Sequence, residues 1–149
     1  GMDREMANTL VAISRIPGLV IVFVAGWATD RFGPRRTLVW IFILTGLLTA
    51  GLGISKGFWT SILVFLQPMI AVCFPPAALV ALSLIGPRET RNLAVSITIP
   101  FAFLIGGGLL PILIGILGDA GAFGVGIVMV GGFIILASIL PRYLIFPRN

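Results

Sequence analysis

Five long apolar stretches follow one another along the chain, and short polar connections separate them, at residues 7–28, 37–54, 58–86, 93–117 and 123–140. A helix needs about 20 mainly apolar residues to cross the hydrocarbon core of a bilayer. The stretches are continuous and do not alternate between apolar and polar residues, which favours helices over barrel strands. We therefore expect an all-α fold, a polytopic transmembrane helix bundle of about five spans over residues 7–149. Residues 1–6 are interpreted as a short polar lead, with Gly1-Met2 as a tag remnant.

The composition supports a membrane protein. Of the 149 residues, 58% are hydrophobic and only 10% are charged, whereas a soluble globular domain has about 25% charged residues because its surface faces water. The chain has no histidine, one cysteine and five acidic residues, so little is available to build a catalytic or metal-binding group. We expect no enzyme activity, no catalytic residue, no cofactor and no metal, and we interpret Cys73 as a small buried apolar residue.

The basic residues are distributed unevenly between the two ends of the expected spans. One end carries Arg4 and Lys56. The other end carries the arginines of the first connection, the third connection and the C-terminal segment, namely Arg31, Arg35, Arg36, Arg88, Arg91, Arg142 and Arg148. By the positive-inside rule we expect an integral protein of the plasma (inner) membrane with its N-terminus outside and its C-terminus in the cytoplasm. The same rule explains the net charge of +5 without a nucleic-acid partner.

Prolines and glycines interrupt the third and fourth stretches. A straight helix over residues 58–86 would be about 43 Å long, whereas the hydrocarbon core is about 30 Å thick, so we expect a bend or tilt near Pro75-Pro76. In the fourth stretch, Pro100 and Pro111 flank Gly106-Gly107-Gly108. These breakers are consistent both with functional bends and with the ordinary composition of membrane helices. Small residues one turn apart predict close helix packing in two places, at Gly46 with Ala50 and at Ala77 with Ala81.

The connection between the first two stretches reads GWATDRFGPRR over residues 26–36. We expect Gly26 to let a neighbouring helix approach closely. Asp30 lies at the membrane boundary, where a carboxylate can pair with an arginine or accept hydrogen bonds from a helix N-terminus. Gly33-Pro34 predicts a turn within a polar connection at residues 29–36. Arg35 and Arg36 would face lipid phosphates or acidic partners.

This segment resembles the signature loop of the major facilitator superfamily, G-x-x-x-D-R-x-G followed by basic residues, with matches at Gly26, Asp30, Arg31, Gly33, Arg35 and Arg36. Pro34 departs from the pattern, which commonly has a basic residue there. Members of that family have twelve spans in two six-helix halves, and the loop follows the second and the eighth span. The resemblance implies five of the six spans of one half, without its leading helix.

Two further comparisons with the family favour spans 8–12 of the C-terminal half. In the N-terminal half, the span two after the loop usually carries an embedded arginine near a glutamine, and here that stretch has Gln67 but no arginine. The fourth and fifth stretches resemble the end of the C-terminal half, from GGLLP at residues 107–111 through Gly115 to DAG at residues 119–121.

The resemblance implies a function in transport. We expect part of a secondary active transporter that moves a small solute by alternating access between two halves around a central site. Asp30 and Arg31 would be gate residues, and the remaining signature residues would support them. In the family the usual partner of Asp30 comes from the other half, and Arg88 and Arg91 are substitutes on the same side of the membrane.

Two polar residues inside apolar stretches are candidates for the substrate pathway. Arg15 would lie about 22 Å along a helix from Asp30, and an embedded arginine is costly unless it faces a cavity or a partner. It is a candidate to bind an organic anion. Alternatively, it extends to the outer interface and marks a helix start near Ile16-Pro17. Gln67 either faces a cavity or bonds a neighbouring helix, and the second use is favoured. Phe101 and Phe103 are interpreted as lipid-facing or packing residues, and Asp119 as a solvated aspartate in a turn.

Two alternatives to a transporter stay open. The chain is either a free-standing small membrane protein, serving as a scaffold or a half-transporter subunit, or an inactive truncated product. The expected partners are the lipid bilayer, a small-molecule substrate, and either the missing transporter half or a second copy of the chain. Neither the signature nor the remaining sequence identifies the substrate.

Overall fold

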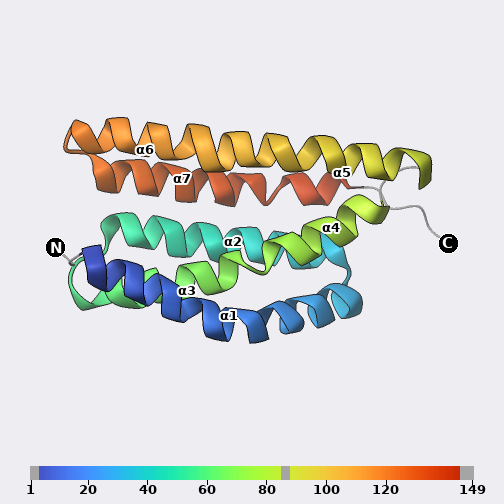
Figure 1. Ribbon diagram of the computed structural model, residues 1–149, viewed down its shortest axis with the longest axis horizontal. Coiled ribbons are helices and arrows are strands. Elements are labelled where there is room, and N and C mark those ends of the chain that lie inside the picture. The colour runs from blue at the N-terminus through green and yellow to red at the C-terminus, as the bar shows by residue number, and fades with distance from the viewer. Residues whose placement is uncertain (1–3, 85–87, 145–149) are drawn as a thin grey trace.

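The computed structural model describes residues 4–84 and 88–144, with side chains at 5–84 and 92–144. Within these ranges the backbone is almost entirely helical and contains no strand (Figure 1). The elements in chain order are α1 (Arg4–Phe32), α2 (Pro34–Ile54), α3 (Phe58–Ala71), α4 (Phe74–Leu84), α5 (Arg88–Phe103), the π-helical η1 (Leu104–Leu109), α6 (Leu110–Asp119), α7 (Phe123–Ala137) and the 3-10 helix η2 (Leu140–Tyr143).

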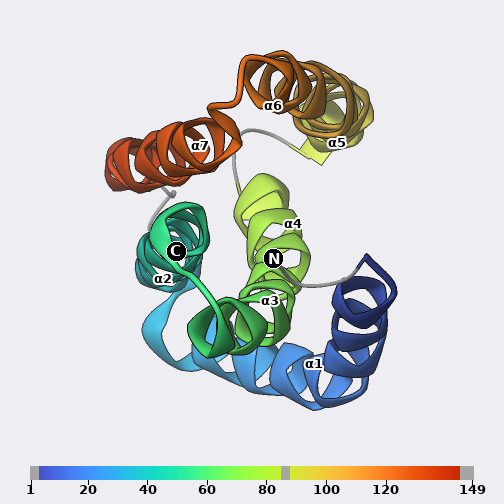
Figure 2. The same ribbon diagram turned by 90° about the vertical axis from the view of Figure 1, so that its left-hand side faces the viewer.

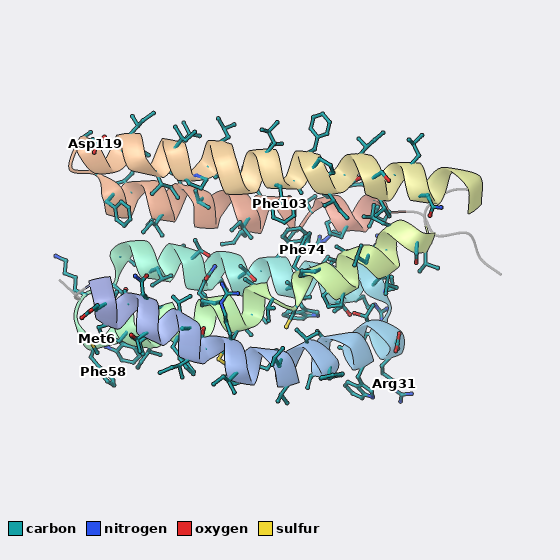
Figure 3. All side chains as sticks on the ribbon, viewed as in Figure 1. Met6, Arg31, Phe58, Phe74, Phe103 and Asp119 are labelled. Carbon is teal, nitrogen blue, oxygen red and sulfur yellow. The ribbon has the colours of Figure 1, made fainter. Side chains whose placement is uncertain are left out.

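The expectation of five spans in an all-α bundle is confirmed. The described residues contain five segments long and apolar enough to cross a membrane, at Glu5–Phe32, Pro34–Ile54, Phe58–Leu84, Asn92–Asp119 and Phe123–Tyr143. Successive spans run in opposite directions. Figure 3 shows the result: Arg31 lies at one end of the bundle, whereas Met6, Phe58 and Asp119 lie at the opposite end.

The first connection is far shorter than the polar segment expected at residues 29–36, and that expectation is wrong. Gly33 alone separates α1 from α2. Its N–H still donates to the Thr29 carbonyl at 3.0 Å, and its φ of 84° turns the chain out of the helix. Pro34 then begins α2, because a proline at a helix start has no N–H that needs an acceptor.

The third span is divided where a bend was expected. The helix is interrupted at Val72 and Cys73, between α3 and α4. Pro75 and Pro76 have no N–H to donate to the carbonyls of Ala71 and Val72, four residues earlier, so a regular helix cannot continue through this point. The Cys73 N–H donates instead to the Ile70 carbonyl at 3.1 Å. The expected end of this span at residue 86 lies outside the described residues.

The fourth span also contains prolines, but it stays helical from Arg88 to Asp119. Pro100 lies inside α5, whereas Pro111 begins α6 directly after the π-helical segment η1, which contains Gly106-Gly107-Gly108. The Leu110 N–H donates to the Ile105 carbonyl, five residues back. This wider turn moves the Pro111 ring away from the carbonyl with which it would otherwise collide.

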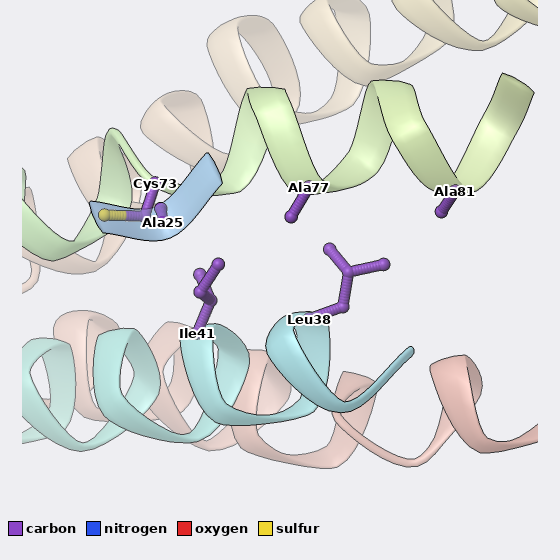
Figure 4. Packing of buried hydrophobic residues seen from close by; sticks show 6 residues of the cluster. All are labelled: Ala25, Leu38, Ile41, Cys73, Ala77 and Ala81. Carbon is purple, nitrogen blue, oxygen red and sulfur yellow. The ribbon is translucent and has the colours of Figure 1, made fainter. Parts of the chain in front are cut away.

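The central helix is α2, which packs most extensively against α7. A Cβ built on Gly46 would stand 2.6 Å from Ile135 Cγ1 and 2.8 Å from the Gly131 carbonyl oxygen, so the two backbones approach as closely as the sequence pattern predicted. The opposite side of α2 faces α4. Figure 4 shows Leu38 and Ile41 pointing towards the buried Ala77 and Ala81.

The fourth span lies at the margin of the bundle. Viewed along the bundle, α5 and α6 sit apart from α1, α2 and α3; α6 lies beside α7, whereas α5 contacts α4 (Figure 2). None of the most apolar part of this span is buried, and the Phe101 and Phe103 side chains are 60% and 74% exposed. An apolar helix with this much exposed surface is suited to contact with lipid or with another protein segment.

Substitution of Gly53 tests the contact between α2 and α7. We expect Gly53→Ala to destabilise the bundle by about 1–3 kcal/mol, because the new Cβ would stand 2.6 Å from Val128 Cγ2 and collide with the Gly124 carbonyl oxygen. Gly132→Ala in α7 is the matched control, since nothing among the described residues lies within 4 Å of its Cβ position. Unfolding in an SDS titration, followed by circular dichroism, measures both. Equal midpoints for the two variants would contradict the packing argument.

Candidate functional site

The signature residues gather at the corner where α1 meets α2. Asp30 and Arg31 occupy the last turn of α1, and Arg35 and Arg36 the first turn of α2. All four side chains are exposed. None forms a salt bridge or side-chain hydrogen bond with another residue in the described part of the chain. The corner therefore presents three guanidinium groups and one carboxylate to its surroundings. The side chains of Arg88 and Arg91, proposed as substitute partners of Asp30, lie outside the described residues.

Two buried threonines, which the sequence analysis did not single out, hold this corner. Thr29 is 2% exposed, and its hydroxyl donates to the Ala25 carbonyl at 2.7 Å. Thr37 is 7% exposed, and its hydroxyl donates to the Gly33 carbonyl at 3.1 Å. They lie four residues before and four residues after Gly33. This symmetrical placement of hydroxyls around a Gly-Pro turn is a sequence signal that could have found them.

The expected role of Gly26 is wrong for the described part of the protein. A Cβ built at this position would meet nothing within 4 Å, so no described helix packs against the glycine. The reason is the tilt of α1, which crosses the bundle obliquely (Figure 2) and contacts its neighbours through another face, the one that carries the buried Ser14, Ala25 and Thr29.

A groove of about 460 Å³ lies beside the corner, between α1 and α2. From α1 it is lined by Ala25, Ala28 and Phe32 among others, and from α2 by residues between Arg36 and Leu44. Cys73, at the break between α3 and α4, also lines it. The lining is mostly apolar, and Arg36 is its charged member. The apolar residues of α1 and α2 are evident in the sequence, but the space between the two helices depends on the angle at which they cross.

Arg15 lies well inside α1, so the alternative that it marks a helix start near Ile16-Pro17 is wrong. The helix begins at Arg4 and continues through Pro17, which lies near its middle. The Arg15 side chain is exposed, and within residues 4–84 and 88–144 it makes no salt bridge or side-chain hydrogen bond. It is a cation on the outside of an apolar span.

Gln67 makes the interhelical hydrogen bond favoured for it. Its amide nitrogen donates to the Thr49 hydroxyl oxygen at 3.3 Å, which joins α3 to α2. The Thr49 hydroxyl in turn donates to the Thr45 carbonyl at 2.7 Å. The hydroxyl oxygen of Thr45 itself is buried and has no hydrogen-bond partner in the described structure. No described hydrogen bond joins Gln67 to Arg15.

The described residues contain no group of three or more His, Cys, Asp or Glu side chains able to hold a metal ion. Cys73 is a free, buried thiol. Asp119 ends α6 with its side chain exposed, next to the turn that contains Gly121 with a φ of 76°. Among the side chains that the structure describes, the charged groups are exposed and lie near the ends of apolar helices, except for Arg15 within α1.

Comparison with known proteins gives one match. The family model described as Major Facilitator Superfamily matches residues 1–149. No curated protein and no solved structure matches the chain. The match covers the signature corner, Arg15 and Gln67.

Alanine substitutions test whether the two signature glycines, Gly26 and Gly33, differ in their importance for stability. We expect Gly33→Ala to destabilise the protein by about 1–3 kcal/mol, because its φ of 84° and ψ of 151° are accessible almost only to glycine. Gly26→Ala, inside α1 with open space around it, should be neutral or stabilise the helix by up to about 1 kcal/mol. Thermal unfolding in detergent, followed by tryptophan fluorescence, measures both. A larger loss for Gly26→Ala than for Gly33→Ala would refute this assignment.

Proposed function

The chain belongs to the Major Facilitator Superfamily, and on this basis we propose that it forms part of a secondary active transporter that moves a small solute by alternating access. The observation that carries the proposal is the family match over residues 1–149. The family consists of transporters, and the chain is an integral membrane protein with five apolar spans. In this mechanism two halves rock about a site near the middle of the bilayer.

The chain corresponds, in this proposal, to spans 8–12 of a twelve-span protein. Its partner is the other half of the transporter or a second copy of the chain. The exposed apolar surface of α5 and α6 supports a partner, because none of the most apolar part of that span is covered. The excess of arginines at the signature end supports a cytoplasmic location for that end, in a plasma (inner) membrane, by the positive-inside rule.

The substrate in this proposal is an organic anion, with Arg15 as its binding cation. Arg15 is the only charged residue inside an otherwise apolar part of α1, and its guanidinium group makes no described salt bridge. A guanidinium group recognises a carboxylate or phosphate through two parallel hydrogen bonds. A lysine cannot form this pair of bonds, but it supplies the same positive charge. Gln67 would lie along the same pathway, on α3.

Asp30 and Arg31 act as gate residues in the same proposal. Both are exposed at the end of α1, where a segment of the other half could reach them. A carboxylate that bonds a cation of the partner half in only one conformation stabilises that conformation selectively. The signature corner would then control the equilibrium between conformations and would not contribute to substrate affinity.

A free-standing membrane scaffold, a half-transporter subunit and an inactive truncated product are the alternatives. The exposed side of α5 and α6 is compatible with a scaffold that binds another membrane protein. The alternatives differ from the main proposal in what the wild-type protein does by itself in a vesicle. A scaffold or inactive product transports no solute.

The test of substrate binding is uptake of a panel of radiolabelled organic anions by proteoliposomes that contain the whole native protein. We expect Arg15→Gln to reduce uptake by about tenfold or more, since it removes a charge-assisted hydrogen bond, and Arg15→Lys to retain most of it. Arg142→Gln is the matched control, because Arg142 is an exposed cation in η2. Unchanged uptake in Arg15→Gln would exclude the role of Arg15, and absence of uptake in the wild type would favour the alternatives.

The test of the gate is the conformational equilibrium of the same protein. We expect Asp30→Asn to shift this equilibrium by about fivefold or more, as measured by distances between spin labels on the two halves, and to leave substrate affinity unchanged in a conformationally locked state. Asp119→Asn is the matched control, since Asp119 is an exposed aspartate at the opposite end of the bundle (Figure 3). Equal loss of both properties in Asp30→Asn would argue against a gate.

A further inference from the structure

The groove between α1 and α2 has a lining that is apolar along its length and basic at one end. Its apolar part includes Ala25, Ala28 and Ile41, and Cys73 lies in the same lining. At the corner it is lined by Arg36 and Thr37. The Thr37 hydroxyl is already a donor to the Gly33 carbonyl. The guanidinium group of Arg36, exposed and without a described side-chain partner, is therefore the polar donor that the groove offers to an occupant.

We propose that this groove binds one acyl chain of an anionic phospholipid, with the phosphate of its headgroup held by Arg36 and the adjacent Arg35. The lipid belongs to the leaflet that surrounds the corner between α1 and α2. Its hydrocarbon chain extends from Arg36 along α1 and α2 towards Cys73. The site is separate from Arg15, the residue to which we assign substrate binding.

Charge complementarity and the surrounding aromatic residues identify the occupant. Arg31, Arg35 and Arg36 outnumber the single carboxylate of Asp30 at this corner, and juxtamembrane arginines attract anionic lipids. The Trp40 and Phe32 side chains line the groove and are 64% and 54% exposed. Tryptophan side chains concentrate at the level of the lipid headgroups. A phospholipid supplies both the anionic and the apolar part that this lining matches.

A transmembrane helix could cover this groove but could not fit inside it. A helix with its side chains is about 10–12 Å wide, so 460 Å³ would hold only about one turn of it. A flexible hydrocarbon chain has no such minimum width and can follow the angle between α1 and α2.

Fluorescence quenching of Trp40 tests the proposal. The chain has three tryptophans, and Trp27→Phe with Trp59→Phe leaves Trp40 in the groove as the reporter. The whole chain is reconstituted in vesicles of unlabelled phosphatidylcholine. These contain increasing fractions of one of two lipids brominated on the acyl chains, either phosphatidylglycerol or phosphatidylcholine. We expect brominated phosphatidylglycerol to quench Trp40 with an apparent affinity about tenfold higher or more, since two arginines contribute. The double variant Arg35→Gln/Arg36→Gln should abolish this preference.

Two further variants make the result specific. Arg142→Gln removes an exposed arginine outside the groove lining and should leave the preference unchanged. Ala28→Leu keeps every charge but fills part of the groove, so it should reduce quenching by phosphatidylglycerol even if the double arginine variant fails to fold.

Four results would overturn the proposal. These are equal quenching by the two brominated lipids, a preference that survives in Arg35→Gln/Arg36→Gln, a preference lost equally in Arg142→Gln, and quenching unaffected by Ala28→Leu. Quenching that appears only when the protein is diluted in lipid would also overturn it, because a second copy of the chain would then occupy the groove.

Discussion

Inside a bilayer every backbone N–H and C=O must find its partner within the protein, because no water is available there. This constraint explains the behaviour of the buried hydroxyls. Thr29, Thr37 and Thr49 each donate to a carbonyl four residues earlier, so these side chains need no partner from another helix and can be buried at little cost.

Small residues take the place of a large hydrophobic core. Lipid tails are as apolar as leucine, so burial of large apolar side chains does little to hold membrane helices together, whereas close approach of their backbones does. The buried apolar residues accordingly include Ala25, Ala77 and Ala81, and the contact of α2 with α7 depends on glycines such as Gly46 and Gly53. Large side chains such as Phe23, 79% exposed, point away from the bundle.

The number of spans, the Gly33 turn and the interruption before Pro75-Pro76 could be predicted from the sequence because each depends on local backbone chemistry. The length of the first connection could not, since the polar residues 29–31 and 35–36 are typical of a loop although their backbones continue the helices. Gly26 shows a second limit: a glycine in a membrane helix predicts a close contact only if a neighbouring helix lies on its face, and that depends on the tilt of α1. The groove and the interhelical bond of Gln67 likewise depend on helix angles, which no local pattern specifies.

The π-helical segment η1 sets the rotational phase of the helix that follows it. One extra residue in a turn rotates everything downstream by about 100° and shifts it by about 1.5 Å relative to an uninterrupted α-helix. The face that α6 turns towards α7 is therefore determined at Leu104–Leu109, well before the two helices meet. Gly106 and Gly108 have open space where a Cβ would be, but Pro111 opposes a return of this segment to α-helical register, because its ring would then collide with the Gly107 carbonyl. Pro111 therefore fixes which side chains α6 presents on its exposed side.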